Sequence, residues 1–191
     1  TESVRDLARA VARVLSPAAV VVGRDTRESG QALENAVVEG FAAEGVSVHL
    51  LGVVPTPAIA FASERHGHAA IALTASHNPW TDNGVKVFAP GGTKLSDAQQ
   101  IEIEREWHAL STERPVVALG QVHDASAMVD EYVEHRIGVV GAGSLRRLHI
   151  VVDCANGAMS EVAPLVLSAL GATVETMNAQ PNGRNINDGC G

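Results

Sequence analysis

The spacing of apolar residues changes between helical and strand periodicity along the first half of the chain. Residues 3–15 place Val4, Leu7 and Val11 three or four positions apart with arginines between them, which predicts an amphipathic helix. Residues 18–22 form a short apolar run typical of a fully buried strand. The segments that continue this alternation are helices at about 31–43 and 55–66 and strands at about 46–51 and 69–74. This β-α-β-α-β order predicts a parallel sheet with right-handed crossovers.

The second half of the chain carries shorter apolar segments. Residues 85–88 alternate, so Lys86 and Phe88 share one face of a predicted strand. The remaining predicted features are a helix of roughly three turns after Ser96-Asp97, a polar connection through Pro115, a helix at about 126–137, a Gly-rich linker at Gly138–Gly143, a strand at 148–152, a helix at about 161–170 and a strand at 173–177. We therefore predict an α/β fold, with a three-layer α/β/α domain around a mostly parallel mixed sheet over residues 1–143. The start of a second, similar domain follows over residues 144–191. Thr26 or Ser29 is predicted to cap the helix at 31–43.

Composition and charge narrow the class of protein. The 191 residues are 46% apolar and 19% charged, which predicts a packed core, and a net charge of −8 disfavours a nucleic-acid partner. The only two cysteines, Cys154 and Cys190, are far apart, which excludes a disulfide scaffold and a cysteine-based zinc site. No apolar run approaches roughly 18 residues and no signal peptide is recognisable, so we expect a cytoplasmic protein with no membrane contact. The start at Thr1, without methionine, and the end at Gly191 suggest a piece of a longer protein.

The strongest candidate for chemistry is the polar stretch Thr74-Ala75-Ser76-His77-Asn78-Pro79, which follows a predicted buried strand. In α/β sheets, ligands bind outside the carboxyl ends of the strands. Ser76 is therefore a candidate nucleophile or group carrier. The adjacent His77 is poorly placed to act as its base, and the absence of Gly-x-Ser-x-Gly disfavours an α/β-hydrolase elbow. The alternative is a turn whose side chains bond their own backbone.

Other charged residues have both a functional and a structural interpretation. Lys86 suits a phosphate or a proton transfer, or is an ordinary lysine on a solvent-facing strand. Arg24 and Arg27 could hold an anion at a helix N-terminus, or pair with Asp25 and Glu28 in the same loop. Two further groups receive no function: Asp153, a lone carboxylate beside an Asn156-Gly157 turn, and the histidines at 66, 68, 108, 123, 135 and 149, which lack ligand spacing.

The motifs taken together resemble the α-D-phosphohexomutase superfamily. The resemblance rests on Gly-Arg-Asp-Thr-Arg at 23–27, Thr-Ala-Ser-His-Asn-Pro at 74–79, Asp-Asn-Gly-Val-Lys at 82–86 and Asp-Cys-Ala-Asn-Gly-Ala at 153–158, in this order. The tail at 181–191 is most similar to the bacterial phosphoglucosamine mutase branch. The resemblance covers essentially the whole chain.

The resemblance implies a mechanism and roles for individual residues. Ser76 would be a phosphoserine that donates its phosphoryl group to a sugar phosphate and regains one from a bisphosphorylated intermediate. His77 and Lys86 would assist as catalytic residues, and Asn78, Arg24 and Arg27 would bind substrate or phosphate. The implied metal is Mg²⁺, bound to Ser76 through its phosphate, with aspartate ligands beyond Gly191.

The implied reaction interconverts glucosamine 6-phosphate and glucosamine 1-phosphate through glucosamine 1,6-bisphosphate, feeding UDP-N-acetylglucosamine and cell-wall synthesis, and a homodimer is possible. The family's Thr-Asp-Gly-x-Arg-Gly segment should precede Thr1, and its Asp-Gly-Asp-x-Asp-Arg loop and two further domains should follow Gly191. We therefore expect the 191 residues to be inactive alone. The alternatives are a phosphomannomutase or phosphoglucomutase and, from another class, a non-catalytic α/β binding module.

Overall fold

The computed structural model describes residues 1–110 and 120–191 and contains two sheets. The larger is six-stranded in the order β5-β4-β3-β1-β2-β6, and the smaller pairs β7 with β8. The strands are β1 (Ala19–Arg24), β2 (Ser47–Val53), β3 (Ala69–Leu73), β4 (Val85–Ala89), β5 (Thr93–Lys94), β6 (Val122–Asp124), β7 (His149–Asp153) and β8 (Thr173–Met177). The β3-β1-β2-β6 part is parallel, whereas β4 and β5 are antiparallel, so the predicted mixed sheet is confirmed.

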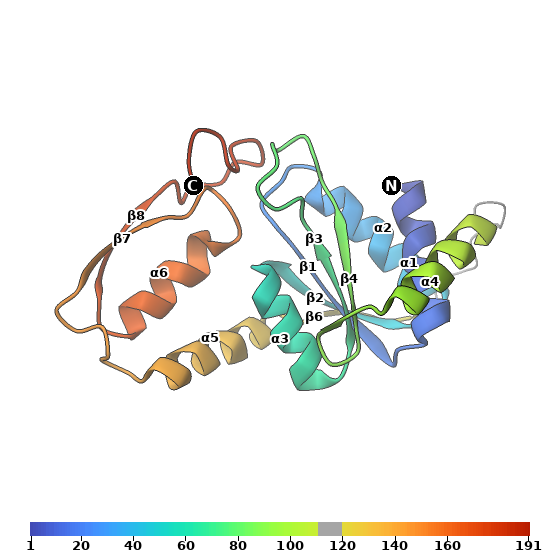
Figure 1. Ribbon diagram of the computed structural model, residues 1–191, viewed down its shortest axis with the longest axis horizontal. Coiled ribbons are helices and arrows are strands. Elements are labelled where there is room, and N and C mark those ends of the chain that lie inside the picture. Colours follow the sequence, from blue (N-terminus) through green and yellow to red (C-terminus); the bar gives the residue numbers. More distant parts are fainter. Residues whose placement is uncertain (111–119) are drawn as a thin grey trace.

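Helices cover both faces of the larger sheet (Figure 1). They are α1 (Glu2–Leu15), α2 (Gly30–Ala43), α3 (Thr56–His66), α4 (Asp97–Leu110), α5 (Ala127–Val140) and α6 (Met159–Ala169). The central strand β1 explains the layering, because its side chains alternate between the two faces. Val20 and Val22 pack into a core with α1 and α2, and Val21 packs into a second core with α3 and α5. Among the described residues, each helix is too short or too polar to cross a bilayer.

The strand before the serine motif is buried along its whole length, and β4 returns antiparallel beside it. As predicted, Phe88 faces the core of α3, while Val85 and Val87 face the core of α1 and α2. Lys86, opposite Ala72, is exposed. Because β4 pairs with β3, the turn between them projects from the carboxyl edge of the parallel strands.

Two details differ from the sequence prediction. Strands β5 and β6 were not predicted, because two or three residues are too few for a period to show. Helix α5 continues through Gly138 to Val140, since the missing side chain of Gly138 faces open space and one glycine costs a helix only about 1 kcal/mol. The predicted connection through Pro115 lies outside the described residues.

The predicted caps have mixed outcomes. Ser96 caps α4, where its Oγ accepts a hydrogen bond from the backbone N–H of Gln99 at 3.3 Å. The prediction for α2 is wrong, because Ser29 occupies the N-cap position without a side-chain cap bond. Its Oγ instead accepts a hydrogen bond from Asn83, and Thr26 donates to the carbonyl of residue 156.

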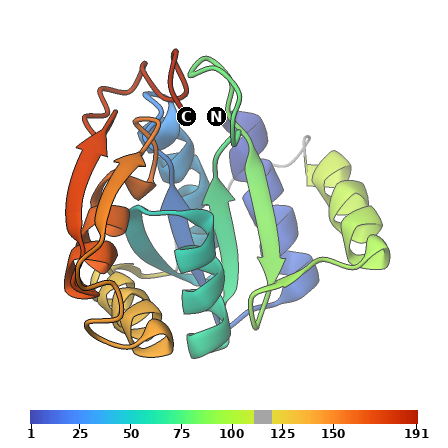
Figure 2. The ribbon, with the colours of Figure 1, turned by 60° about the vertical axis from the view of Figure 1, so that its left-hand side comes forward.

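The second unit consists of β7, α6 and β8, followed by an irregular tail from residue 178 (Figures 1 and 2). Val162 and Val166 of α6 join the core formed by α3 and α5, which connects this unit to the larger sheet. The tail lies beside the turn between β3 and β4 in both views. Segments more than a hundred residues apart in sequence therefore meet at one end of the molecule.

Candidate functional site

Ser76 lies on a loop of residues 74–83, here called the serine loop, between β3 and β4. The loop closes where the N–H of Thr74 donates to the carbonyl of Gly84 at 2.9 Å. The N–H of Ser76 donates to Thr74 Oγ1 at 3.0 Å, and Ser76 has a φ of 57°, in the left-handed region. A serine held there stores about 1 kcal/mol or more of backbone strain. Its side chain is exposed, and its hydroxyl makes no hydrogen bond with residues 1–110 or 120–191.

Arg27 holds the backbone of the serine loop. Its side chain is fully buried, and its Nε donates to Asp25 Oδ2 at 2.9 Å. The remaining guanidinium contacts are all backbone carbonyls of the loop: Nη1 reaches Pro79 and, at 2.9 Å, Asp82, and Nη2 reaches Ser76 at 3.0 Å and Asn78 at 2.9 Å. A guanidinium has five N–H groups, and this arrangement uses all of them.

This geometry corrects the expectation that Arg27 binds phosphate, because no N–H of its side chain is left for a ligand. The predicted pairing within the loop is right for Asp25 and Arg27 only. Arg24 instead lies 3.3 Å from Glu34 and donates to Gln31 at 2.9 Å. Arg24 also lines a small cavity of about 40 Å³ together with Thr74, at the carboxyl ends of β1 and β3.

The other predicted site residues project from the serine loop and from β4. His77 and Lys86 are exposed, and neither forms an ion pair within the described ranges. The Nδ2 of Asn78 donates to Asp82 Oδ2 at 3.1 Å. Ser76, His77 and Asn78 thus share one loop, and Lys86 stands on the strand that leaves it.

The sequence did not indicate that the tail reaches this loop. Asn187 Nδ2 donates to the carbonyls of Ser76 at 3.0 Å and Asn78 at 3.1 Å. The tail has no periodicity, and its partners are backbone atoms, which leave no trace in a sequence pattern.

The loop of residues 153–158 lies next to the tail. Asp153 accepts hydrogen bonds from the N–H of Gly191 at 3.0 Å, the N–H of Ala155 at 2.9 Å and the amide of Asn178 at 3.1 Å. These donors, Gly191 foremost, lower the pKa of Asp153 below the usual value of an aspartate. The buried Asn156 bonds to the backbone of residues 180 and 185. The loop is a structural support, in keeping with the interpretation of Asn156-Gly157 as a turn.

No set of three or more metal-binding side chains converges among the described residues. The carboxylate of the serine loop, Asp82, already accepts hydrogen bonds from Asn78 and Thr81. Mg²⁺ prefers six oxygen ligands, of which proteins commonly supply one or two carboxylates. The described residues therefore do not form a complete Mg²⁺ site.

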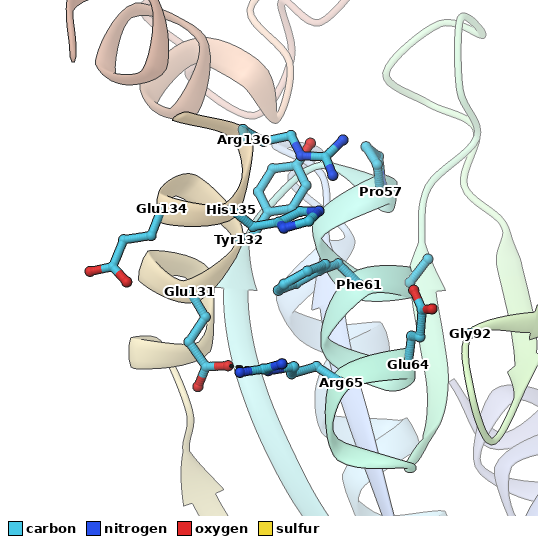
Figure 3. Close-up of a pocket in the computed structure, with 11 residues that line it drawn as sticks. Pro57, Phe61, Glu64, Arg65, Gly92, Glu131, Tyr132, Glu134, His135 and Arg136 are labelled. Atoms are coloured by element: carbon cyan, nitrogen blue, oxygen red, sulfur yellow. Dashed lines mark ion pairs between the residues drawn. The ribbon is translucent and has the colours of Figure 1, made fainter. Parts of the chain in front are cut away.

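A cavity of about 890 Å³ lies between α3 and α5, away from the serine loop (Figure 3). Phe61 stacks on His135 with ring centroids 4.9 Å apart, and Arg136 lies 5.4 Å from the centroid of Tyr132. Arg65 and Glu131 form an ion pair at 3.9 Å across it. None of the predicted site residues lines this cavity.

Four histidines, three of which received no function from the sequence, form a stacked group. His49 lies 5.2 Å from His68 and 5.0 Å from His123 between ring centroids, and His66 lies 6.0 Å from His68. Burial, followed by the charges of the neighbouring rings, lowers the pKa of His49, and burial and His66 lower the pKa of His68. The lowered pKa values favour the neutral forms of His49 and His68, in keeping with packing of these rings against their neighbours.

Comparison with known proteins finds relatives over most of the chain. Residues 1–114 match the family described as phosphoglucomutase/phosphomannomutase, alpha/beta/alpha domain I. A protein named phosphoglucosamine mutase from Salinispora tropica is 49% identical over 180 residues, which cover 92% of this chain and 40% of that protein. One of the same name from Mycobacterium sp. strain KMS is 47% identical over 193 residues, covering 97% and 43%. The chain thus spans about 40% of the length of these relatives.

Solved structures share the fold. A phosphoglucomutase/phosphomannomutase family protein from Burkholderia thailandensis superimposes with a TM-score of 0.78 at 32% identity, over 94% of this chain and 40% of that one. A structure from Thermus thermophilus gives a TM-score of 0.83 at 27% identity, over 96% and 43%.

Proposed function

The chain belongs to the phosphoglucomutase/phosphomannomutase family, and from that premise we propose that it carries the phosphoryl-transferring serine of a phosphosugar mutase. In the whole protein, Ser76 passes a phosphoryl group to a hexosamine phosphate and takes one back from the bisphosphate. The substrates are glucosamine 6-phosphate and glucosamine 1-phosphate, because relatives at 49% and 47% identity are named phosphoglucosamine mutase. One observation carries the proposal: Ser76 is exposed on a loop whose backbone carbonyls are held by a buried arginine.

Phosphoryl transfer asks little covalent chemistry of the protein and depends on positioning and charge. In the forward step, the bond between phosphorus and Ser76 Oγ breaks and a bond from phosphorus to a sugar hydroxyl oxygen forms, while the hydroxyl proton leaves to a nearby base and Ser76 Oγ takes up a proton. In the return step, the bond between phosphorus and the oxygen at the sugar's other position breaks and a bond from phosphorus to Ser76 Oγ forms, while the serine proton leaves and the released sugar oxygen is protonated. Lys86 is the group of this chain that assists proton movement and offsets the charge of the phosphate, and His77 orients the phosphate or the reacting hydroxyl.

Mg²⁺ would supply electrostatic stabilisation of the transferring group. The described residues lack a complete ligand set, and the ion's carboxylate ligands would come from the part of the protein beyond Gly191. Within this chain, the ion would be held through the phosphate on Ser76.

The domain division is a proposal as well. Residues 1–143 would form the domain that carries the phosphoserine, and residues 144–191 would begin the next. Two separate sheets and the end of α5 at Val140 support this division. Since the chain spans about 40% of its relatives, we expect these 191 residues alone to show no turnover.

The decisive test uses the full-length protein that contains this chain. We expect intact-mass analysis to find one phosphoryl group on Ser76 and a coupled assay to detect mutase activity, both lost in Ser76→Ala. The matched control is Ser160→Ala, since Ser160 bonds only within its own turn. Absence of both phosphate and mutase activity in the wild type would favour the non-catalytic module, and full activity of Ser76→Ala would overturn the role of Ser76. Relative rates on glucosamine, mannose and glucose phosphates separate the three sugar specificities.

A further inference from the structure

The tail crosses the serine loop at the two carbonyls nearest to the reactive side chain. Asn187 Nδ2 donates to Ser76 O at 3.0 Å and to Asn78 O at 3.1 Å. Arg27 Nη2 donates to the same two oxygens at 3.0 and 2.9 Å. A carbonyl oxygen has two lone pairs, so each of these carbonyls is held by one donor from the loop between β1 and α2 and one from the tail.

Residues 182–187, here called the strap, are fixed to the first unit at a second point. Arg184 makes a two-pronged ion pair with Glu28, with Nε and Nη2 at 2.9 and 2.8 Å from the two carboxylate oxygens. Its guanidinium lies 5.3 Å from the ring centroid of Trp80 in the serine loop. The N–H of Glu28 donates to Gly183 O at 2.9 Å. Gly183 has a φ of 90°, and a Cβ there would lie 3.3 Å from the Cα of Glu28, so the approach requires glycine.

The other side of the strap is tied to the second unit. The N–H of Asn187 donates to the carbonyl of Ala155 at 3.0 Å, and Asn156 Nδ2 donates to the carbonyl of Asn185 at 3.2 Å. Ile186, between them, is buried. A continuous chain of contacts therefore runs from the loop at 153–158, through the strap, to the backbone of Ser76.

From these contacts we infer that Asn187 is a positioning residue: it sets the orientation of Ser76 and makes phosphoryl transfer depend on the docking of the second unit. This inference rests on the proposed function. Arg27 is buried and keeps the serine loop folded, whereas Asn187 is at the surface. Losing the Asn187 amide therefore removes one of the two donors from each carbonyl without opening the core. We expect this loss to change the geometry at Ser76 more than the stability of the protein.

The test is Asn187→Asp in the full-length protein. The substitution keeps shape and suits the positive φ of 59° at this position, but it removes both N–H groups and sets a carboxylate against two carbonyl oxygens. We expect kcat to fall at least about tenfold, since small misplacements of reacting groups are costly. We expect the KM for sugar phosphate and Tm to stay close to wild type. Asn35→Asp, on the exposed face of α2, carries the same charge change and should match wild type.

A second readout does not need activity. In a full-length background in which Trp107 and every tryptophan outside this chain are replaced by Phe, Trp80 is the remaining tryptophan, and we expect Asn187→Asp to increase acrylamide quenching of its fluorescence because the strap loosens. An inactive wild type would refute the proposed function alone, and quenching would still test the strap. Unchanged kcat with unchanged quenching, or a parallel loss of kcat and Tm, would overturn the positioning role.

Discussion

Two polar loops follow parallel strands in this chain, one a buried strand and the other a largely exposed one, and the loops are stabilised in opposite ways. In the serine loop, the side chains of Ser76 and His77 are exposed, and the backbone carbonyls are held by Arg27. In the loop at 153–158, the exposed carboxylate of Asp153 and the buried amide of Asn156 bond to the backbone themselves. Both begin at the carboxyl end of a parallel strand.

The contrast shows that a polar side chain in such a loop either faces a substrate or supports the loop's own backbone. A polar side chain that satisfies its own backbone is not available to a substrate. A loop that presents its polar side chains to a substrate needs donors from elsewhere for its backbone carbonyls. In the serine loop, a buried guanidinium from a distant part of the chain supplies them. Removing the guanidinium should therefore affect the first loop, and removing loop side chains should affect the second.

The largest effect is expected for Arg27→Met. The substitution leaves Asp25, which is also buried, without its partner and releases the loop carbonyls. Breaking a buried pair in this way costs about 3–5 kcal/mol. We expect urea unfolding to show a loss of that size and the full-length protein to lose nearly all phosphate on the serine.

The control is Arg27→Met with Asp25→Asn, which also removes the orphaned charge. It should regain part of the lost stability but not the phosphorylation, because the loop carbonyls stay unheld. A double variant with normal phosphorylation would contradict the role given to Arg27.

The next effect is expected for Asn156→Ala. The buried amide bonds to the backbone at residues 180 and 185, and leaving such groups unsatisfied costs about 1–3 kcal/mol. Ser76→Ala should change stability by less than about 0.5 kcal/mol, since the exposed serine side chain supports nothing in the described structure. Thermal unfolding of the two variants compares the two loops directly, and equal losses of stability would contradict the difference between them. Asn156→Gly removes the amide but readily adopts the positive φ of 49°, so it separates the contribution of the amide from that of the backbone conformation.

A smaller effect is expected for Gly84→Ala at the exit of the serine loop. A Cβ at Gly84 would lie 2.9 Å from the carbonyl oxygen of Thr74, which is backbone and has to shift. Overpacking of this kind costs about 1–3 kcal/mol, and at the partly exposed end of a loop we expect the lower limit. Because the shift reaches Thr74, phosphorylation of Ser76 should slow as well. Gly138→Ala, where a Cβ meets open space, is the matched control and should be neutral or stabilising.

The layers around the larger sheet were predictable because the apolar spacing of each long element shows which type of element it is and how far it is buried. The apolar run of β1 predicted a fully buried strand and the alternation in β4 predicted two faces, and the structure confirms both. Strand β6 and the end of α5 were missed because pairing with β2 and the solvent-facing position of Gly138 depend on tertiary neighbours.

The candidate site was predictable only in its side chains. The position of Ser76 after a buried strand showed where chemistry could occur, but not what supports it. The acceptors of Arg27 are carbonyls 49 to 55 residues away, and those of Asn187 are 109 and 111 residues away. Any residue type offers a carbonyl, so no pattern of side chains indicates these contacts.

The smallest expected effect is a pH dependence confined to the second loop. Hydrogen bonds from Gly191, Ala155 and Asn178 lower the pKa of Asp153 in the folded protein. Its stabilising contribution is therefore present above the ordinary aspartate pKa of about 4 and is lost as pH falls through the lower folded value. Asp153→Asn should lower Tm slightly at pH 6, and the two Tm curves should converge as the pH falls below about 4. A gap that stays constant below about pH 4 would mean that Asp153 supports its loop by shape rather than by charge.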